Sequence, residues 1–361
     1  MKVAFRADAS IDIGTGHIMR CLTLADELRN RGAEINFICR EHTGNLIDLI
    51  QGRGYLVVTL PLAESEYFLT PDDVAHADWL GDSWQQDAAD TIAALGKVRT
   101  DWLIIDHYAI DHRWEEILRP HVSKIMVIDD LADRLHDCDL LLDQNLYMAM
   151  NTRYDNLVSG SCIKLLGPAY ALLRPEFATA RKKLRQRDGQ IRRVLVFFGG
   201  VDPTNETEKA LQALAGRSDR QYEVDVVVGI SNPHKESIHK FCNSYDGFCY
   251  YCQVSNIAEL MSTADLAIGA TGATTWERCA MGLPALVTYV ADNQKQIAES
   301  TDHAGVIICM GALSSVSQET YKHRFSAILS NSVIVRVMSE KAIQLVDCNG
   351  LLRVVEKMVC K

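Results

Sequence analysis

Ile13-Gly14-Thr15-Gly16-His17-Ile18-Met19-Arg20 stands between a short apolar run, Lys2 to Phe5, and a segment whose apolar residues recur at helical spacing from Ile18 to Gly32. The apolar run is typical of a buried parallel strand, and the later spacing predicts an amphipathic helix that ends at the glycine. The stretch therefore predicts the strand, loop and helix that begin an α/β fold. His17 and Arg20 fall in the first turn of that helix.

The composition of this loop favours a ligand site. Gly14 and Gly16 allow a ligand to approach the backbone, and the first turn of a helix offers unpaired N–H groups. The positive end of the helix dipole favours a neutral imidazole at His17, the form that accepts a proton. We therefore predict a general base at His17, with Arg20 and the two glycines beside the substrate. The loop meets neither the dinucleotide nor the P-loop signature, and a histidine that caps its helix explains the local pattern equally well.

Length and composition predict a globular protein with two domains. The chain has 361 residues, 48% hydrophobic and 23% charged, so each half can bury its own core. A formal net charge of −10 without a basic block argues against nucleic acid and membrane surfaces as partners. Eleven scattered cysteines and a charged, strand-like N-terminus unlike a signal peptide favour the cytoplasm, where we expect a monomer.

One group of residues resembles a zinc site. His239, Cys242, Cys249 and Cys252 have spacing that partly fits zinc. Residues 247–252, however, have strand character, and alternation along a strand would point the last two cysteines to opposite faces. We therefore expect no metal here.

Segments with strand and helix character alternate throughout, which predicts parallel sheets with helices on both faces. The strands expected in the first half are Val3–Arg6, Ile35–Cys39, Leu56–Leu60, Trp102–Asp106, Lys124–Ile128 and Leu140–Leu142. Those expected in the second half are Arg192–Phe198, Glu223–Val228, Phe248–Cys252, Leu266–Ile268, Ala285–Val287 and Val306–Ile308. The pattern predicts two doubly wound, Rossmann-like domains.

The predicted domains are residues 1–175 and 190–345, followed by a terminal helix over 346–361. The apolar residues expected on one face of that helix are Leu351, Leu352, Val355 and Val359. We expect a basic helical connector over Arg174–Gln190, with Arg181–Arg187 as its solvated face. Because ligands of open α/β sheets bind at the carboxyl ends of the strands, the two domains predict an interdomain cleft.

Polar motifs follow the predicted strands of the first half. Gly14–Arg20 follows the first strand, Asp106-His107-Tyr108 follows Leu103–Ile105, and Asp129-Asp130 follows Ile125–Ile128. Asp106, Asp129 and Asp130 could bind magnesium in principle, since that ion takes hard oxygen ligands. We interpret them instead as strand-end carboxylates that orient His17, bind sugar hydroxyls or cap helices.

A second group of motifs lies in the other half. Residues 266–284 read as a strand, a small-residue turn, a helix and a Gly-Leu-Pro stop. The turn from Thr271 to Thr275, with Gly272, supplies hydroxyls and backbone donors at a helix start, which predicts a phosphate cradle without a metal. Glu277, a turn further on, could reach ribose hydroxyls. A helix cap with a polar surface is the alternative.

Two further positions complete this predicted site. Asn293 and Gln294 open another helix and can aim their amides at the same ligand. Ile257 follows a strand, and its backbone groups can contact a base ring. An ordinary amphipathic helix start explains Ile257 almost as well.

These motifs resemble a known family. The two halves look like a GT-B glycosyltransferase fold, and the second half is similar to the UDP-sugar-binding domain of the peptidoglycan N-acetylglucosaminyltransferase. Gly14–Arg20, Asp106–Tyr108 and Asp292–Gln294 resemble more closely the UDP-2,4-diacetamido-2,4,6-trideoxy-β-L-altropyranose hydrolase family of pseudaminic acid biosynthesis. This resemblance spans nearly the whole chain.

The resemblance implies roles for single residues. In that family the loop histidine activates water, the tyrosine after Asp-His and the asparagine before Gln line the sugar site, and the helix glutamate holds ribose. The matching positions are His17, Tyr108, Asn293 and Glu277. The family reaction is a hydrolysis that inverts the anomeric carbon and releases UDP and the free sugar, without a metal or another cofactor.

Three alternatives fit the same fold, namely a UDP-sugar glycosyltransferase, a non-catalytic UDP-sugar-binding protein and a sugar 2-epimerase. An epimerase is expected to have more paired carboxylates and histidines than the motifs supply. A transferase needs an acceptor surface, usually basic or apolar, and the stretch Tyr67–Asp78 is acidic. A histidine beside the glycine turn disfavours a protein without catalysis. The sequence therefore favours the hydrolase, whose partner is a small-molecule UDP-sugar.

Overall fold

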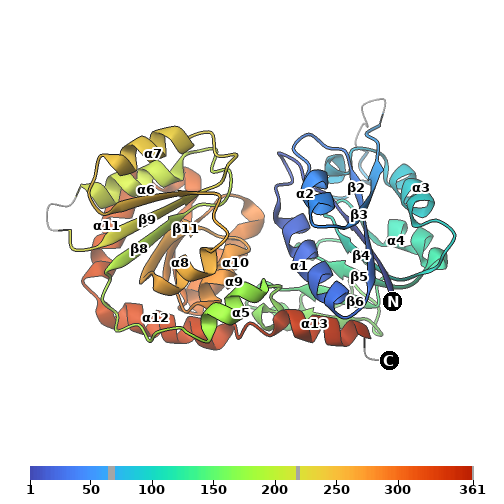
Figure 1. Cartoon of the computed structure of the whole chain (residues 1–361). Helices are drawn as coiled ribbons and strands as arrows, with labels where there is room; N and C mark the ends of the chain where they lie inside the picture. Colours follow the sequence, from blue (N-terminus) through green and yellow to red (C-terminus); the bar gives the residue numbers. More distant parts are fainter. Residues whose placement is uncertain (64–69, 217–219, 360–361) are drawn as a thin grey trace. The chain divides into compact units, whose positions relative to one another are not determined.

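The computed structural model describes residues 1–63, 70–216 and 220–359, and the chain divides into two compact units (Figure 1). Unit 1 comprises Met1–Asn145, Ala149–Leu172 and Asn349–Lys361. Unit 2 comprises Leu146–Met148 and Leu173–Cys348. Each unit contains one parallel sheet covered by helices, which confirms the predicted α/β class.

The sheet of unit 1 has seven parallel strands in the order β3-β2-β1-β4-β5-β6-β7. The strands are β1 Lys2–Ala7, β2 Glu34–Arg40, β3 Leu56–Leu60, β4 Thr100–Asp106, β5 Val122–Ile128, β6 Leu140–Asp143 and β7 Ile163–Leu166. Alternate residues of β1 enter different cores, because successive side chains point to opposite faces of a sheet. Val3 and Phe5 belong to one core and Ala4 to the other. The apolar run at the N-terminus is therefore buried on both faces.

Helices cover both faces of this sheet. They are α1 Gly16–Asn30, α2 Ile47–Gly52, α3 Trp84–Leu95, α4 His112–Leu118 and α13 Gly350–Val359. Short 3₁₀ turns are η1 Ala77–Leu80, η2 Arg119–His121, η3 Met150–Thr152 and η4 Pro168–Tyr170. The register of β1 with β4 pairs Ala7 with Asp106, so the loop before α1 and the loop after β4 leave the same edge of the sheet.

The C-terminal helix α13, drawn in red in Figure 1, belongs to unit 1 and packs against α1. Its buried face differs from the predicted one. The side chains that enter the core are Leu351, Val354, Val355 and Met358. Leu352 and Val359 are exposed. Residues three, four and seven positions after Leu351 share its face of the helix, and these two residues do not.

The sheet of unit 2 has six parallel strands in the order β10-β9-β8-β11-β12-β13. The strands are β8 Arg193–Phe197, β9 Glu223–Val228, β10 Phe248–Cys252, β11 Leu266–Ala270, β12 Ala285–Tyr289 and β13 Ile307–Ala312. The other elements are α5 Pro175–Arg181, α6 Glu206–Ala215, α7 Lys235–Asn243, α8 Ile257–Thr263, α9 Thr274–Ala280, α10 Asp292–His303, η5 Leu313–Ser315, α11 Gln318–Leu329 and α12 Ser332–Leu345. A Cβ on Gly269 would lie 2.2 Å from the Phe197 carbonyl oxygen, so β11 needs glycine beside β8.

The predicted helical connector over Arg174–Gln190 is wrong beyond α5. Within Arg181–Arg187, Lys182, Lys183, Arg185 and Gln186 are exposed as predicted, whereas Arg187 is buried. Arg187 is 2% exposed. Its guanidinium donates to the carbonyls of Ala264 and Met281. These two residues are the C-terminal caps of α8 and α9. Helix ends leave carbonyls unpaired, and a guanidinium carries five donors. Arginines that a charge pattern assigns to solvent therefore bind helix ends.

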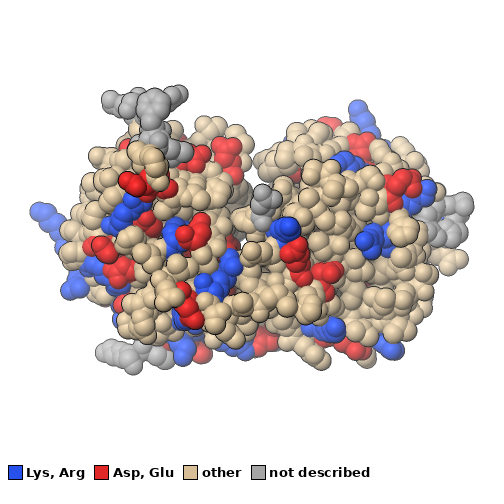
Figure 2. Space-filling model, turned by 180° about the vertical axis from the view of Figure 1, so that it is seen from behind, with Lys and Arg blue, Asp and Glu red and all other residues tan. Residues whose placement is uncertain are grey.

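Two other predictions of the sequence need comment. The edge strand β7 was missed, because its four residues, interrupted by Lys164, are too few to show a clear period. Residues 67–69 of the acidic stretch Tyr67–Asp78 lie outside the described residues. Within the described ranges, no helix combines the length and apolar character needed to cross a membrane. Figure 2 shows Lys and Arg interspersed with Asp and Glu on the face in view.

Candidate functional site

The loop that carries the predicted base is held by its own hydrogen bonds. The Ser10 side-chain oxygen accepts from the amides of Asp12 and Ile13, at 3.1 and 2.9 Å, and the Gly14 amide donates to the Ser10 carbonyl at 2.9 Å. Gly14 has φ +77°, a conformation that other residues rarely adopt. A Cβ on Gly16 would meet no atom within 4 Å, so the start of α1 is open beside His17.

His17, Arg20 and Asp106 form a buried cluster in unit 1. The His17 Nδ1 atom lies 2.5 Å from Asp106 Oδ1. Arg20 donates through Nε and Nη2 to the two oxygens of the same carboxylate, both at 2.6 Å. His17 is 6% exposed and Asp106 is fully buried. The structure therefore brings together the loop motif and the Asp-His-Tyr motif.

The charge on Asp106 determines which nitrogen of His17 can act as a base. Burial alone would raise the pKa of Asp106, but the Arg20 charge and the hydrogen bonds from Arg20 and His17 hold this pKa well below its usual range. An ionised Asp106 accepts a hydrogen bond, so we assign the proton of neutral His17 to Nδ1. The Nε2 atom then carries the free lone pair, and within the described part of the chain it has no hydrogen-bond partner.

Tyr108 lies against the base, with its ring edge-to-face to the His17 ring at 4.7 Å between centroids. Its hydroxyl donates to Asp130 Oδ1 at 2.5 Å. Burial and then the Asp130 charge raise the pKa of Tyr108 well above its ordinary value, so the phenol stays neutral. Asp130 also accepts from Asn145 Nδ2 at 3.1 Å and lies 3.4 Å from Arg20 Nη1.

Asp129 has a different environment from its neighbour. Its carboxylate lies 2.9 Å from Arg134 Nη1 and accepts from the Ala132 amide and the Tyr154 hydroxyl. Burial would raise the pKa of Asp129, but the charges of Arg134 and His136, together with the hydrogen bonds from Ala132 and Tyr154, outweigh burial and lower this pKa to about 2. Asp129 therefore holds the loop after β5, whereas Asp106 and Asp130 support His17 and Tyr108.

Sequence reasoning missed two aromatic residues beside Tyr108. The His76 ring lies 4.3 Å from the Trp79 ring, and the Trp79 ring is stacked near Tyr108, with 5.9 Å between centroids and 28° between planes. His76 lies in the stretch Tyr67–Asp78 that the sequence indicated only as acidic, and Trp79 directly follows that stretch. The two aromatic side chains, three residues apart, were the available signal.

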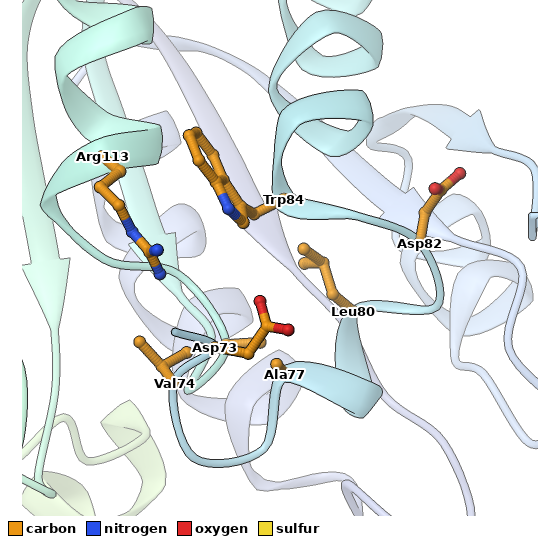
Figure 3. Close-up of a pocket in the computed structure, with 8 residues that line it drawn as sticks. Asp73, Val74, Ala77, Leu80, Asp82, Trp84 and Arg113 are labelled. Carbon is orange, nitrogen blue, oxygen red and sulfur yellow. The ribbon is translucent and has the colours of Figure 1, made fainter. Parts of the chain in front are cut away.

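A small pocket, partly open to solvent, lies near this cluster (Figure 3). It is lined by Asp73, Val74, Ala77, Leu80, Asp82, Trp84, Ala109 and Arg113. None of these residues is among the predicted site residues. Figure 3 shows Trp84 and Arg113 projecting from neighbouring helices, and the Arg113 guanidinium lies 5.1 Å from the Trp84 ring centre.

In unit 2 the turn between β11 and α9 is fastened to β12. The backbone amide and the hydroxyl of Thr271 both donate to the Thr288 carbonyl, at 2.9 and 3.3 Å. The Gly272 amide donates to the Thr275 hydroxyl at 3.3 Å. The hydroxyls of Thr271 and Thr275 therefore stabilise the turn, and the predicted cradle depends on the remaining backbone groups.

A buried cation lies beneath this turn. Arg278 is 2% exposed and donates through Nη2 to the Ala270 carbonyl and the Thr275 hydroxyl, at 3.0 and 3.2 Å. Among the described residues no carboxylate forms an ion pair with it, and its buried Nε atom finds no acceptor. Burial lowers the pKa of Arg278 to about 10, so the guanidinium is charged at neutral pH. This charge makes the turn favourable for an anion.

The other predicted residues of unit 2 follow the carboxyl ends of strands. Glu277 Oε1 lies 3.2 Å from Arg174 Nη2, and desolvation raises the pKa of Glu277 although Arg174 opposes this rise. Asn293 is exposed in the first turn of α10, and Gln294 accepts from the Val290 amide at 3.0 Å. Arg174 was missed, because the sequence assigned it to the connector.

Ile257 is set apart from these residues. It begins α8 after the edge strand β10, and β10 is three positions from β11 in the sheet. Its side chain is 5% exposed, and the neighbouring Asn256 carbonyl accepts from the amides of Glu259 and Leu260. A contact between Ile257 and a ligand would therefore be made by its backbone, beside β10 and not beside β11.

Comparison with known proteins gives three relatives, although no family model matches the chain. The UDP-2,4-diacetamido-2,4,6-trideoxy-beta-L-altropyranose hydrolase of Campylobacter jejuni is 30% identical over 266 residues, which are 73% of this chain and 83% of that protein. The spore coat polysaccharide biosynthesis protein SpsG of Bacillus subtilis is 24% identical over 98% of this chain and 96% of its own length. Uncharacterized protein MJ1062 of Methanocaldococcus jannaschii is 25% identical over 82% of this chain, and the match spans just 57% of that protein.

Solved structures resemble the chain over its whole length. MurG of Acinetobacter baumannii has a TM-score of 0.67 at 15% identity, with 99% of both chains covered. UGT89C1 of Arabidopsis thaliana has a TM-score of 0.66 at 12% identity, again with 99% of both chains covered. The structure of LpCGTa in complex with UDP has a TM-score of 0.65 at 12% identity and covers 100% of this chain and 99% of that one. These likenesses establish the GT-B fold that the sequence predicts.

Proposed function

Because the chain belongs to the same protein family as the UDP-2,4-diacetamido-2,4,6-trideoxy-beta-L-altropyranose hydrolase of Campylobacter jejuni, we propose that it hydrolyses a UDP-linked diacetamido trideoxy sugar. The products are UDP and the free sugar, in a step of pseudaminic acid biosynthesis. The fold and the family make the protein a nucleotide-sugar enzyme. The proposal adds that water, and not a second sugar or a lipid, accepts the sugar.

The observation that supports hydrolysis best is the hydrogen bond between His17 Nδ1 and Asp106. It leaves Nε2 as the basic nitrogen of a fixed imidazole. In the proposed step Nε2 takes a proton from water, the water oxygen bonds to the anomeric carbon, and the bond from that carbon to the UDP oxygen breaks. Attack opposite the leaving group inverts the configuration. Gly14, Gly16 and Arg20 surround the base, and Tyr108 contacts the sugar.

The residues of unit 2 are proposed to hold UDP. The breaking bond leaves negative charge on the pyrophosphate, and fixed donors that meet developing charge lower the barrier. The amides of Thr271 and Gly272 already bond within the turn, so the backbone after Gly272, at the start of α9 and near the buried Arg278, is proposed to supply the donors. In this proposal Glu277 binds ribose, Asn293 and Gln294 approach the sugar, and the backbone at Ile257 contacts the base.

The proposed reaction uses no metal. The carboxylate oxygens of Asp106 are engaged by His17 and Arg20, and those of Asp130 by Tyr108 and Asn145. A cation would have to displace these partners. We therefore expect activity to persist in EDTA, and loss of activity that magnesium restores would assign these carboxylates to a metal instead.

Hydrolysis in ¹⁸O-labelled water tests the proposal. Attack at the anomeric carbon places the label in the free sugar and leaves UDP unlabelled. The products are analysed by mass spectrometry soon after mixing, beside unlabelled free sugar kept in the same water as a control for exchange. Label in UDP would indicate attack at phosphorus. UDP release that requires an added acceptor would identify a glycosyltransferase, and no release with any UDP-sugar would identify a binding protein.

A further inference from the structure

Other residues hold the backbone of the segment that carries His76 and Trp79. Leu80 is 1% exposed and belongs to the core on the α3 and α4 face of the unit 1 sheet. The Arg113 guanidinium donates to the Asp72 carbonyl at 3.1 Å. These contacts fix the backbone of the segment, so the two aromatic rings are not needed to hold it.

The two rings are half-buried and continue the aromatic surface of Tyr108. The His76 and Trp79 ring centres lie 5.7 and 5.9 Å from the Tyr108 centre, and Tyr108 in turn contacts His17. A row of rings therefore runs from the proposed base to Trp79. Apolar ring faces with an adjacent polar group suit a ligand that has both kinds of surface.

The backbone at His76 also indicates a use for its side chain. His76 has φ 62°, in the left-handed region, where a residue with a Cβ costs about 1–2 kcal/mol more than in the right-handed region. Glycine would avoid this cost. The imidazole caps no helix, and within the described residues it forms contacts with aromatic rings but no hydrogen bond. The fold alone does not explain a histidine at this position.

We propose that Trp79, supported by His76, is the platform on which the sugar ring of the nucleotide sugar stacks, and that it selects N-acetylated deoxy sugars. This inference rests on the proposed function. The C–H face of a pyranose, the methyl groups of two acetamido substituents and the methyl group of a 6-deoxy sugar are apolar and match an indole face. A sugar with free hydroxyls at these positions has less apolar surface to bury.

Calorimetry of the full chain with two probes, UDP and UDP-N-acetylglucosamine, tests the platform. The quantity compared is the ratio of the Kd for the sugar nucleotide to the Kd for UDP. Trp79→Ala should raise this ratio about 10-fold, as expected for loss of one aromatic contact with its buried area, while the Kd for UDP stays unchanged. Trp79→Phe should restore most of the effect. Trp84→Phe, a tryptophan outside the row of rings, should behave as the wild type.

The outcomes separate the platform from the proposed function. A ratio that does not change in Trp79→Ala, while UDP still binds, would overturn the platform alone. An equal loss of affinity for both probes would also overturn it, because that result indicates a structural role. Failure of the wild type to bind UDP at all would overturn both proposals.

Discussion

The carboxyl edges of the two sheets carry different chemistry, although both sheets are parallel and doubly wound. In unit 1 this edge holds titratable side chains in direct contact, with His17 and Arg20 on one carboxylate, Asp106. In unit 2 the corresponding edge holds threonines and glycine, with a buried guanidinium, Arg278, behind them. Paired titratable groups can move protons, whereas backbone donors above a fixed positive charge can hold an anion.

In the proposed function, one architecture that is used twice is divided between catalysis in unit 1 and binding in unit 2. The division follows from what each edge can do chemically, since the ends of parallel strands place loops together whatever residues the loops contain. Substitutions at the two edges should therefore change different kinetic constants. The following predictions test that division, beginning with the largest effect.

Replacing His17 should have the largest effect. His17→Ala and His17→Asn should lower kcat by a factor of about 10² or more, because a general base typically contributes 10² to 10⁴. The Kd for UDP should stay nearly unchanged, and calorimetry provides that control. Turnover at the wild-type rate in His17→Ala would remove the histidine from the mechanism and with it the catalytic assignment of unit 1.

Replacing Glu277 should have the opposite signature. Glu277→Ala should raise KM about 10-fold, as expected for loss of about 1.4 kcal/mol of binding, with little change in kcat. Glu176→Ala is a matched control, because Glu176 also pairs with Arg174, at 3.0 Å, but lies on α5. A fall in kcat at constant KM for Glu277→Ala would contradict a binding role.

Acidification should destabilise unit 1 through its buried carboxylates. The pKa of Asp129 is about 2 in the folded protein, because the Arg134 charge and the other favourable contacts of this carboxylate together outweigh burial, and about 3.9 in an unfolded chain. Its contribution to stability is therefore complete above about pH 4 and is lost as the pH falls toward 2. Asp8, Asp87 and Asp106, also in unit 1, have pKa values shifted in the same direction.

Thermal unfolding at several pH values measures this loss. Trp276 is the one tryptophan of unit 2, so fluorescence of Trp276→Phe reports on unit 1. Asp129→Asn should be about 3 kcal/mol less stable at pH 7, because Arg134 loses the buried one of its two carboxylate partners and keeps only Asp133, and less dependent on pH between 4 and 2. An unchanged pH dependence in Asp129→Asn would show that this carboxylate does not drive the loss.

Asp143 should show the smallest effect and the opposite pH dependence. Burial, and then the charge of Asp130, raise the pKa of Asp143 well above its ordinary value. The folded protein keeps a proton that the unfolded chain releases above about pH 4, so this group lowers stability as the pH rises. Asp143→Asn should change the free energy of unfolding at pH 7 by about 1 kcal/mol or less, toward greater stability. A large loss measured in urea would contradict this expectation.

Much of the fold could be predicted because it depends on local patterns. Apolar runs that alternate with helical periodicity identified the strands β1 and β11 and the helix α1. The contacts of Arg187 could not be predicted in this way. Its partners are carbonyls at the ends of α8 and α9, and a charge pattern carries no information about which helix ends a side chain will meet.

The candidate site shows the same limit. His17 and Asp106 could each be identified, since each follows a strand and carries a side chain suited to proton transfer. The rings of His76 and Trp79 could not be assigned to the site, because their place beside Tyr108 depends on how the segment after β3 folds back toward the end of β4. Distance along the chain does not limit contacts in a folded protein.

The sequence by itself determined the alternation of strands and helices, the glycine loop before α1 and the side chains that stand at the carboxyl ends of the strands. Only the tertiary structure decided which partner each aspartate binds. The order β1-β4-β5 brings Asp106 to His17 and Asp130 to Tyr108, while Asp129, the adjacent residue, pairs with Arg134. The physical reason is that a carboxylate's ionisation and partners depend on burial and on charges delivered by other strands, which local sequence does not contain.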